Sequence, residues 1–180
     1  MIKGSGFSLR LIRKNDLDNL YAMMNDTSNK GRFYPANLTP EPRFFKTFEE
    51  SGFWDDNIGR LLIVDDDDRM LGVINYFRST PYFDGYEIGY ILYKNEKRGK
   101  GIMTVVLGLF VEHIFKTKYI NRLEIRADID NLASNKVALN CGFVFEGVVR
   151  GAVLLDGRHV DINQYSLLRS DWLAKQETPG

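Results

Sequence analysis

The stretch from residue 86 to residue 115 constrains the fold most, because it joins a strand, a glycine-bearing loop and a strongly apolar helix. Residues 86–93 alternate as a strand requires, with even-numbered residues on one face and odd-numbered residues on the other. Residues 102–115 are apolar on most sides of a helix, which predicts that this helix is buried. A strand that leads into a buried helix indicates a sheet with helices packed on its faces.

Hydrophobic periodicity predicts the other elements along the chain. Alternation favours further strands over residues 8–12, 60–64, 70–77, 123–129, 143–155 and 159–168. Helical spacing favours further helices over residues 15–24, 39–52 and 131–139. The order of these elements predicts an α/β fold, an α+β mixed sheet of about seven strands flanked by about four helices.

Local signals mark several ends of these elements. Asn15 is a candidate cap for the first helix, and Thr39-Pro40 begins the second with proline at the tolerated first position. Gly52 is a plausible stop for that second helix. The acidic run 65–68 and the Asp156-Gly157 pair are turn signals, and each predicts a hairpin between its flanking strands.

Length and composition predict one globular domain. The chain has 180 residues, of which 44% are hydrophobic and 27% charged, and we expect a domain over residues 1–175 with a loose tail over 176–180. A formal net charge of zero disfavours nucleic-acid binding through a broad basic face. The sequence has neither an apolar run of about 18 residues nor a secretory signal, so no membrane association is expected.

The sequence predicts neither a disulfide nor a metal site. Cys141 is the only cysteine, which favours a reducing cytoplasm and a role as core filler. His113 and His159 lie in different predicted elements without ligand spacing. The acidic run 65–68 lacks the spaced ligands and the glycine of a calcium loop, so a turn is the better interpretation.

The loop before the buried helix is the clearest candidate site. Gly99 and Gly101 allow a tight turn that brings backbone amides close to an anion, and the helix directs its positive end to the same place. Arg98 and Lys100 add positive charge. These features predict a pyrophosphate cradle, with an ordinary glycine-containing loop as the alternative. The loop is neither a nucleotide P-loop nor a dinucleotide fingerprint, because it lacks their remaining residues.

With this loop the chain resembles the GNAT acetyltransferases. Arg98, Gly101 and Met103 match the family pattern Gln/Arg-x-x-Gly-x-Gly/Ala, with Met103 in place of the small final residue. Further similar segments are Tyr86–Ile91, Asp130–Asn135, Asn140–Phe143 and Glu146-Gly147. The C-terminal end is similar to the RimJ/RimL branch, which acetylates protein N-termini, at Asp156-Gly157, Asp161, Tyr165–Leu168 and Trp172. The resemblance runs from about Ser8 to Trp172.

The resemblance implies an acetyl-CoA site with no metal. The sheet would splay beside the strand that ends near Tyr93, and the pantetheine arm would pair with the exposed backbone of that strand. The implied cofactor-binding residues are Ile91, Tyr93, Arg98, Gly99, Lys100, Gly101, Ile102, Met103, Asn131 and Ser134. Asn131 resembles a residue that hydrogen-bonds the CoA arm, with a turn-forming asparagine as the alternative.

Two residues are candidates for catalysis. Glu87 lies on the strand that borders both ligands and would accept a proton from the amine directly or through water, or else only orient substrate or pair with a cation. Ser134 is similar to a serine near the CoA sulfur and would protonate the departing thiolate, or else serve as a helix N-cap. Tyr90 and Tyr93 are interpreted as packing residues.

Four aromatic residues are candidates to form a wall of the acceptor site. Phe33, Tyr34, Phe53 and Trp54 lie in segments that cover the acceptor site in this family, together with Glu87 as a substrate contact. Burial in the core is the alternative for each of the aromatic residues.

Three functions remain in competition after the sequence is considered. The first is acetyl-CoA-dependent N-acetylation of a protein N-terminal α-amine, and the second is acetylation of a small amine such as a polyamine, amino acid or antibiotic. The third is a non-catalytic acetyl-CoA-binding module. An acidic acceptor groove would favour a polyamine, and an open groove would favour a peptide. The sequence leaves open whether the chain acts as a monomer or a homodimer.

Overall fold

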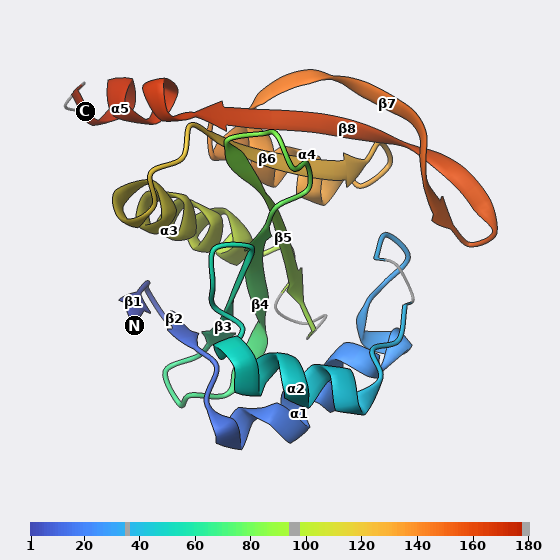
Figure 1. Ribbon diagram of the computed structural model, residues 1–180. Helices are drawn as coiled ribbons and strands as arrows, with labels where there is room; N and C mark the ends of the chain where they lie inside the picture. Colours follow the sequence, from blue (N-terminus) through green and yellow to red (C-terminus); the bar gives the residue numbers. More distant parts are fainter. Residues whose placement is uncertain (35–36, 94–97, 178–180) are drawn as a thin grey trace.

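The computed structural model describes residues 1–34, 37–93 and 98–177. Within these residues the strands are β1 Ile2–Lys3, β2 Ser8–Leu11, β3 Ile58–Val64, β4 Met70–Phe77, β5 Gly85–Leu92, β6 Arg122–Asp128, β7 Val144–Leu155 and β8 Arg158–Leu168. The α-helices are α1 Leu17–Asn25, α2 Glu41–Ser51, α3 Ile102–Thr117, α4 Leu132–Asn140 and α5 Arg169–Glu177, with short 3-10 helices at Lys14–Asp16 and Thr27–Asn29. Figure 1 shows these elements around one sheet.

The eight strands form one mixed sheet in the order β1-β2-β3-β4-β5-β6-β8-β7, which confirms the predicted fold class. Every neighbouring pair is antiparallel except β5 and β6, which run parallel. The periodicity missed β1, because a strand of two residues is too short to show alternation. It also missed α5, whose sequence has no clear apolar stripe. The expected tail boundary between residues 175 and 176 falls inside α5.

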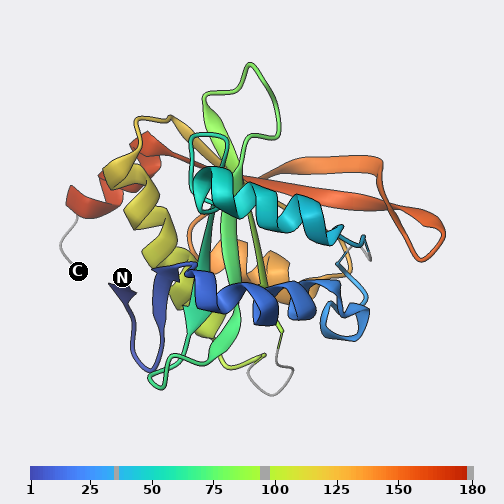
Figure 2. The same cartoon turned by 60° about the horizontal axis from the view of Figure 1, so that its bottom comes forward.

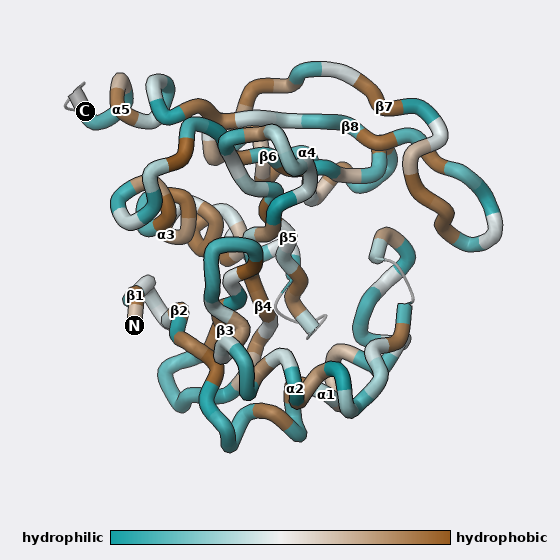
Figure 3. The backbone as a smooth tube through the Cα atoms, in the orientation of Figure 1, coloured by the Kyte–Doolittle hydropathy of each residue, from teal (hydrophilic) through white to brown (hydrophobic). Residues whose placement is uncertain are grey.

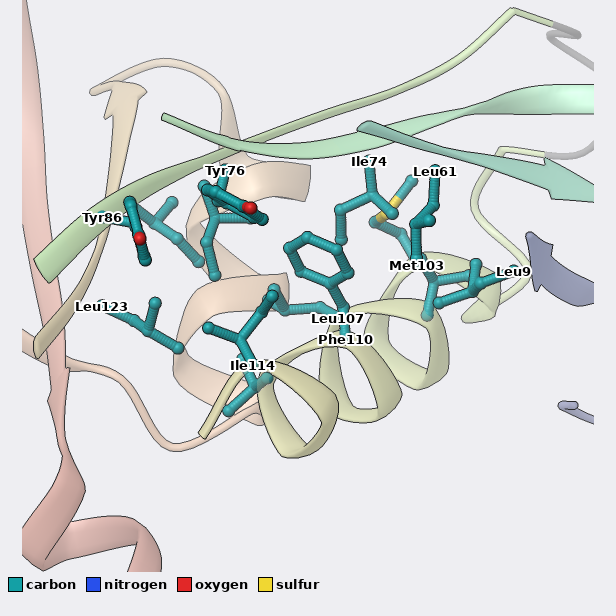
Figure 4. Packing of buried hydrophobic residues seen from close by; sticks show 14 of the residues in the cluster. Leu9, Leu61, Ile74, Tyr76, Tyr86, Met103, Leu107, Phe110, Ile114 and Leu123 are labelled. Carbon is teal, nitrogen blue, oxygen red and sulfur yellow. The ribbon is translucent and has the colours of Figure 1, made fainter. Parts of the chain in front are cut away.

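One face of the sheet packs on α3. Leu107, Phe110 and Ile114 of this helix are fully buried, as the predicted apolar helix requires. Figure 4 shows them against side chains of β2, β3, β4, β5 and β6, including Leu9 and Tyr76. Figure 3 shows the matching apolar colouring along α3 and the central strands. Burial of this continuous apolar surface stabilises the fold.

The opposite face of the sheet is covered by α1 and α2 (Figure 2). Phe44 of α2 is buried against Leu17 and Leu20 of α1, and its ring lies 5.0 Å from that of Phe53. Gly52 ends α2 in the left-handed conformation with φ 62°, as its sequence position predicts. The two sheet faces therefore have separate cores.

Two predicted helix starts need correction. The prediction of Asn15 as the cap of α1 is wrong, because residues 14–16 form a 3-10 turn and Asp16 occupies the N-cap position. The Asp16 carboxylate instead accepts hydrogen bonds from Arg10 and from the backbone N–H of Arg13. Pro40 is the N-cap residue of α2 and precedes the first helical position by one residue.

The acidic run 65–68 forms the predicted turn between β3 and β4. Asp65 Oδ1 accepts hydrogen bonds from the backbone N–H groups of Asp67 and Arg69. Asp68 reaches back to β2, where its Oδ1 lies 2.6 Å from Nε of the buried Arg10. The run is thus a structural turn joined to a buried arginine.

The sheet splays open between β5 and β6, as the resemblance implies. The two strands pair only at residues 85–87 with residues 122–124. Beyond this point β5 continues to Leu92 along β4, while β6 continues to Asp128 along β8. Figure 1 shows the two halves of the sheet diverging. Across the described residues, no helix is long and apolar enough to cross a membrane.

Candidate functional site

A cavity of about 740 Å³ lies where β5 and β6 diverge. Its walls come from β3, β4, β5, β6, the start of α4, residues within 30–34 and 37–39, and the long β7 and β8 strands that extend beyond the rest of the sheet (Figure 1). Among the predicted site residues it is lined by Phe33, Tyr34, Glu87, Tyr93, Asn131 and Ser134. The fold therefore brings the two catalytic candidates to the walls of one cavity.

Glu87 lies on β5 at the point where the sheet opens. Its Oε2 is 3.1 Å from Nη1 of Arg126 on β6, and its side chain is 16% exposed. Burial raises the pKa of Glu87 above its ordinary value, although the charge of Arg126 opposes this shift. The pairing of Glu87 with a cation, which was left open as an alternative, is therefore present. Because burial has the larger effect on the pKa, the carboxylate beside the cavity is still more basic than an ordinary one.

Ser134 is in the first turn of α4, but it is not the cap. Asn131 occupies the N-cap position and its Oδ1 accepts a hydrogen bond from the backbone N–H of Ser134 at 3.1 Å. This corrects the N-cap alternative for Ser134 and shows that Asn131 is a helix cap. The Ser134 hydroxyl is instead 2.9 Å from the Tyr90 hydroxyl.

Tyr90 also lines the cavity, which the interpretation as a packing residue did not anticipate. Burial raises the pKa of Tyr90 to about 12, so the phenol is protonated at neutral pH. Together with Ser134 it presents a pair of neutral hydroxyl groups to the cavity. Such a pair can donate a hydrogen bond or a proton to a developing anion.

The predicted cradle leads from β5 into α3. Gly99 and Gly101 have φ values of 73° and 75°, in the left-handed region that residues with a Cβ rarely adopt. Gly101 is the N-cap of α3, and among the described residues no side-chain hydrogen bond caps this end. A Cβ added at either glycine would meet no atom within 4 Å, so space is open beside the backbone at the start of α3.

The Arg98 side chain is engaged elsewhere. Its Nε and Nη2 donate to the carbonyl oxygen of Leu92, and Nη2 also donates to the carbonyl oxygen of Asn29. Arg98 thus joins the end of β5 to the segment after α1. Lys100 is exposed and lies beside the glycines. Residues 94–97, at the start of the predicted charged loop, lie outside the described residues.

The side chains of the remaining cofactor candidates are buried or partly buried. Ile91 and Met103 have buried side chains that pack in the cores on the two faces of the sheet. Figure 4 shows Met103 directed into the core between α3 and the strands. Ile102 is partly buried at the first position of α3. The backbone N–H of Ile91 faces β4, and Ile102 and Met103 form the first turn of α3.

The aromatic candidates divide into two groups. Phe33 and Tyr34 line the cavity. Phe53 is buried in the core below α2, and Trp54 packs edge-on against Tyr76 with ring centroids 5.3 Å apart. Trp54 is absent from the cavity walls, so its position supports the core alternative.

Several polar residues of the cavity escaped the sequence analysis, among them Arg126, Arg60 and Asn75. Arg126 pairs with Glu87, while Arg60 on β3 and Asn75 on β4 line the cavity as direct cross-strand neighbours. In the sequence, each of these residues is visible only as a charged or amide side chain on a predicted strand. Without knowledge of strand order, nothing in the sequence related these residues to Glu87.

Cys141 and the acidic residues offer no competing chemistry in the described parts of the chain. The Cys141 thiol donates to the carbonyl oxygen of Thr104, and burial raises its pKa to about 11, which disfavours a nucleophilic thiolate. Within residues 1–34, 37–93 and 98–177, no group of three or more His, Cys, Asp or Glu side chains is placed to hold a metal ion.

The sequence pattern of the acetyltransferase (GNAT) domain matches residues 7–144, and the chain belongs to this family. A ribosomal-protein-serine acetyltransferase of Escherichia coli (strain K12) is 32% identical over 107 residues, which cover 59% of each chain. The chain thus matches about three fifths of the length of that curated relative.

Solved structures share the fold over nearly the whole chain. A Vibrio cholerae spermidine N-acetyltransferase in complex with CoA and spermine has a TM-score of 0.81 and 18% identity, and the match covers 94% of this chain and 99% of that one. RimL, a ribosomal L7/L12 α-N-protein acetyltransferase in complex with coenzyme A, has a TM-score of 0.78 and 24% identity, with 93% and 97% covered.

Proposed function

We propose that this chain is an acetyl-CoA-dependent N-acetyltransferase whose acceptor is the α-amine of a protein or peptide. The observation that carries the proposal is the divergence of β5 and β6 around a cavity that holds a buried carboxylate, Glu87. The family assignment and the ribosomal-protein-serine acetyltransferase among its relatives support it.

The residues present fit acetyl-CoA. The glycines at 99 and 101 and the uncapped start of α3 suit the pyrophosphate, and the unpaired edge of β5 suits the amide-containing arm. When bound, acetyl-CoA supplies a thioester whose C–S bond breaks as the new C–N bond forms. Asn131 and Ser134 would lie beside the arm.

In this proposal Glu87 accepts the proton that the attacking amine gives up. Its raised pKa suits that role, because a more basic carboxylate takes a proton more readily. The hydroxyls of Tyr90 and Ser134 would donate a hydrogen bond or a proton to the departing sulfur. Arg126 would hold the Glu87 carboxylate in position between proton transfers.

The charges of the cavity favour a peptide over a polyamine. Its charged lining residues are three cations, Lys30, Arg60 and Arg126, and two carboxylates, Glu87 and Asp128. A polyamine carries several positive charges and would meet few unpaired carboxylates here, because Glu87 already pairs with Arg126. The acidic groove expected for a polyamine acceptor is therefore not found among the described lining residues.

An acetylation screen tests the proposal. The purified chain would be mixed with acetyl-CoA and with N-terminal peptides, ribosomal proteins, spermidine or amino acids, and the release of free CoA thiol would be measured. Turnover of peptides above the no-amine control is the expected result. Turnover of spermidine alone would select the small-amine alternative. Tight acetyl-CoA binding without turnover of any amine would indicate a binding module.

The cytoplasmic location of the protein also remains a prediction.

A further inference from the structure

Arg60 is a partly buried cation without a carboxylate partner among the described residues. Its Nε is fully buried and makes no hydrogen bond to a described residue, and its Nη1 donates to the Met24 sulfur at 3.3 Å. The guanidinium lies 5.4 Å from the centroid of the Phe53 ring. Within the described residues, no carboxylate lies within ion-pair distance of it. A desolvated guanidinium in this state gains strongly from an anion.

The cavity wall beside Arg60 is built to receive a polar group. In the sheet, Arg60 of β3 lies next to Asn75 of β4, which lies next to Gly89 of β5. The Asn75 residue is 9% exposed and lines the cavity. A Cβ at Gly89 would lie 3.3 Å from Asn75 Nδ2, so the glycine leaves the amide open to the cavity.

The other cations of the cavity are already engaged. Lys30 Nζ donates to the carbonyl oxygen of Asn37 at 2.6 Å, and Arg126 pairs with Glu87 and Glu124. Burial lowers the pKa of Arg60, as expected for a guanidinium that lacks a compensating negative charge. Among the described residues of the cavity, Arg60 is thus the cation whose guanidinium has no oxygen partner.

We propose that Arg60 and Asn75 bind an anionic group, a carboxylate or a phosphate, carried by the acceptor. The inference rests on the proposed function and specifies its substrate class. Glu87 lies two strands from Arg60 and two residues along β5 from Gly89, on the same face. Their backbones are therefore about 10 Å apart across the sheet and about 7 Å along it. The anionic group would lie several bonds from the amine, like an acidic side chain that follows a peptide N-terminus.

Matched acceptors test this proposal. Initial rates would be compared for the peptide amides Ser-Glu-Ala, Ser-Gln-Ala and Ser-Lys-Ala, and phosphoethanolamine would be compared with ethanolamine. We expect kcat/KM to be about tenfold to a hundredfold higher for the anionic member of the preferred pair. Preference within the peptide series identifies an acidic peptide, and preference within the second pair identifies a small phosphorylated amine. Equal rates within both series would overturn the proposal.

Variants of Arg60 assign the preference to this side chain. Arg60→Met keeps the packing on Phe53 and should abolish the preference, because it lowers kcat/KM for Ser-Glu-Ala much more than for Ser-Gln-Ala. Arg60→Lys should retain part of the preference. Melting temperatures confirm that both variants fold. A preference that survives in Arg60→Met, or an equal loss for all acceptors, would contradict the proposal.

A binding measurement separates this proposal from the acetyltransferase activity itself. The affinity of N-acetylated Ser-Glu-Ala and Ser-Gln-Ala amides, and of N-acetylated phosphoethanolamine and ethanolamine, would be measured by calorimetry on CoA-saturated protein. If no amine turns over, the proposed function fails. An Arg60-dependent preference for an anionic ligand would still support the anion site, and the absence of any such preference would overturn it.

Discussion

Glu87 carries two opposing influences on its proton affinity. Burial raises the pKa of the carboxyl, and Arg126 lowers it, with burial the stronger effect. Because the folded state then binds protons more tightly than the unfolded chain, ionisation of Glu87 lowers stability as pH rises through the folded pKa. This loss of stability is consistent with a functional role for Glu87 that requires a basic carboxylate.

Glu87→Gln separates catalysis from structure. If Glu87 is the base, turnover should fall about 100- to 10,000-fold, and acetyl-CoA affinity should barely change. In the wild type, kcat/KM should fall with decreasing pH around a midpoint above 4.5, the ordinary carboxyl pKa, and this dependence should be absent in the variant. Turnover within a few-fold of wild type would make Glu87 structural.

Arg126→Gln is the matched control for this pH profile. Loss of the cation should raise the Glu87 pKa further, so the acid limb of kcat/KM should move to higher pH. Glu124 would keep its ion pair with Arg122, whose Nε lies 2.6 Å away, so the fold should survive. An acid limb that does not move would show that another group controls it.

The hydroxyl pair can be tested apart from the helix cap. Asn131→Ala should cost about 1 kcal/mol of stability in urea unfolding, because it removes the cap of α4. Ser134→Ala keeps that cap and should lower turnover about tenfold, equivalent to about 1.4 kcal/mol of barrier. Tyr90→Phe should lower it to a similar extent. Wild-type turnover in both hydroxyl variants would leave the pair a purely structural contact.

At the scale of elements, the start of α3 depends on backbone conformation. Gly101→Val places a β-branched residue at φ 75° and crowds the cradle. At about 100 times its dissociation constant, acetyl-CoA should stabilise the wild type by roughly 2.7 kcal/mol, and the variant should lose this gain. Gly108→Ala, in open space on the same helix, is the control and should keep it. A normal ligand-dependent melting shift in Gly101→Val would contradict the cradle.

The β3–β4 turn and the start of α1 are joined through Arg10. Its guanidinium pairs with Asp16 at 2.7 Å and with Asp68 at 2.6 Å. Hydrogen bonds from Arg10 and Arg13 lower the Asp16 pKa despite its burial, so its stabilising effect is present above pH 3.8 and is lost as pH falls through the lower folded pKa. Asp16→Asn should cost about 1–3 kcal/mol at neutral pH and less at pH 2. An equal cost at both pH values would exclude this charge effect.

At the scale of the whole molecule, the site exists because the two halves of the sheet separate. The Tyr93 N–H donates to the Leu71 carbonyl oxygen on β4, so alternate residues of β5 direct their amides toward β4. The amides of Tyr90 and Leu92 then face the opening, while those of Gly89 and Ile91 face β4. Acetyl-CoA should slow hydrogen exchange at the first pair much more than at the second. Equal protection of both pairs would contradict pairing along this edge.

The sequence by itself determined most of the elements and the glycine turn before α3. Alternation and helical spacing are local properties, so the central strands, α3 and the glycine turn at 99–101 could be read from the chain. The GNAT resemblance added the splay and the candidates Glu87 and Ser134. Weak or very short elements, such as β1 and α5, carry too little pattern to be predicted.

Only the tertiary structure decided which residues meet in the cavity. Arg60, Asn75 and Gly89 lie far apart in the sequence, and strand order and register bring them into one row. The partners of Glu87 and Ser134 depend likewise on the parallel pairing of β5 with β6 and on the position of α4. Pairing between distant strands reflects the packing of the whole sheet, which local periodicity does not encode.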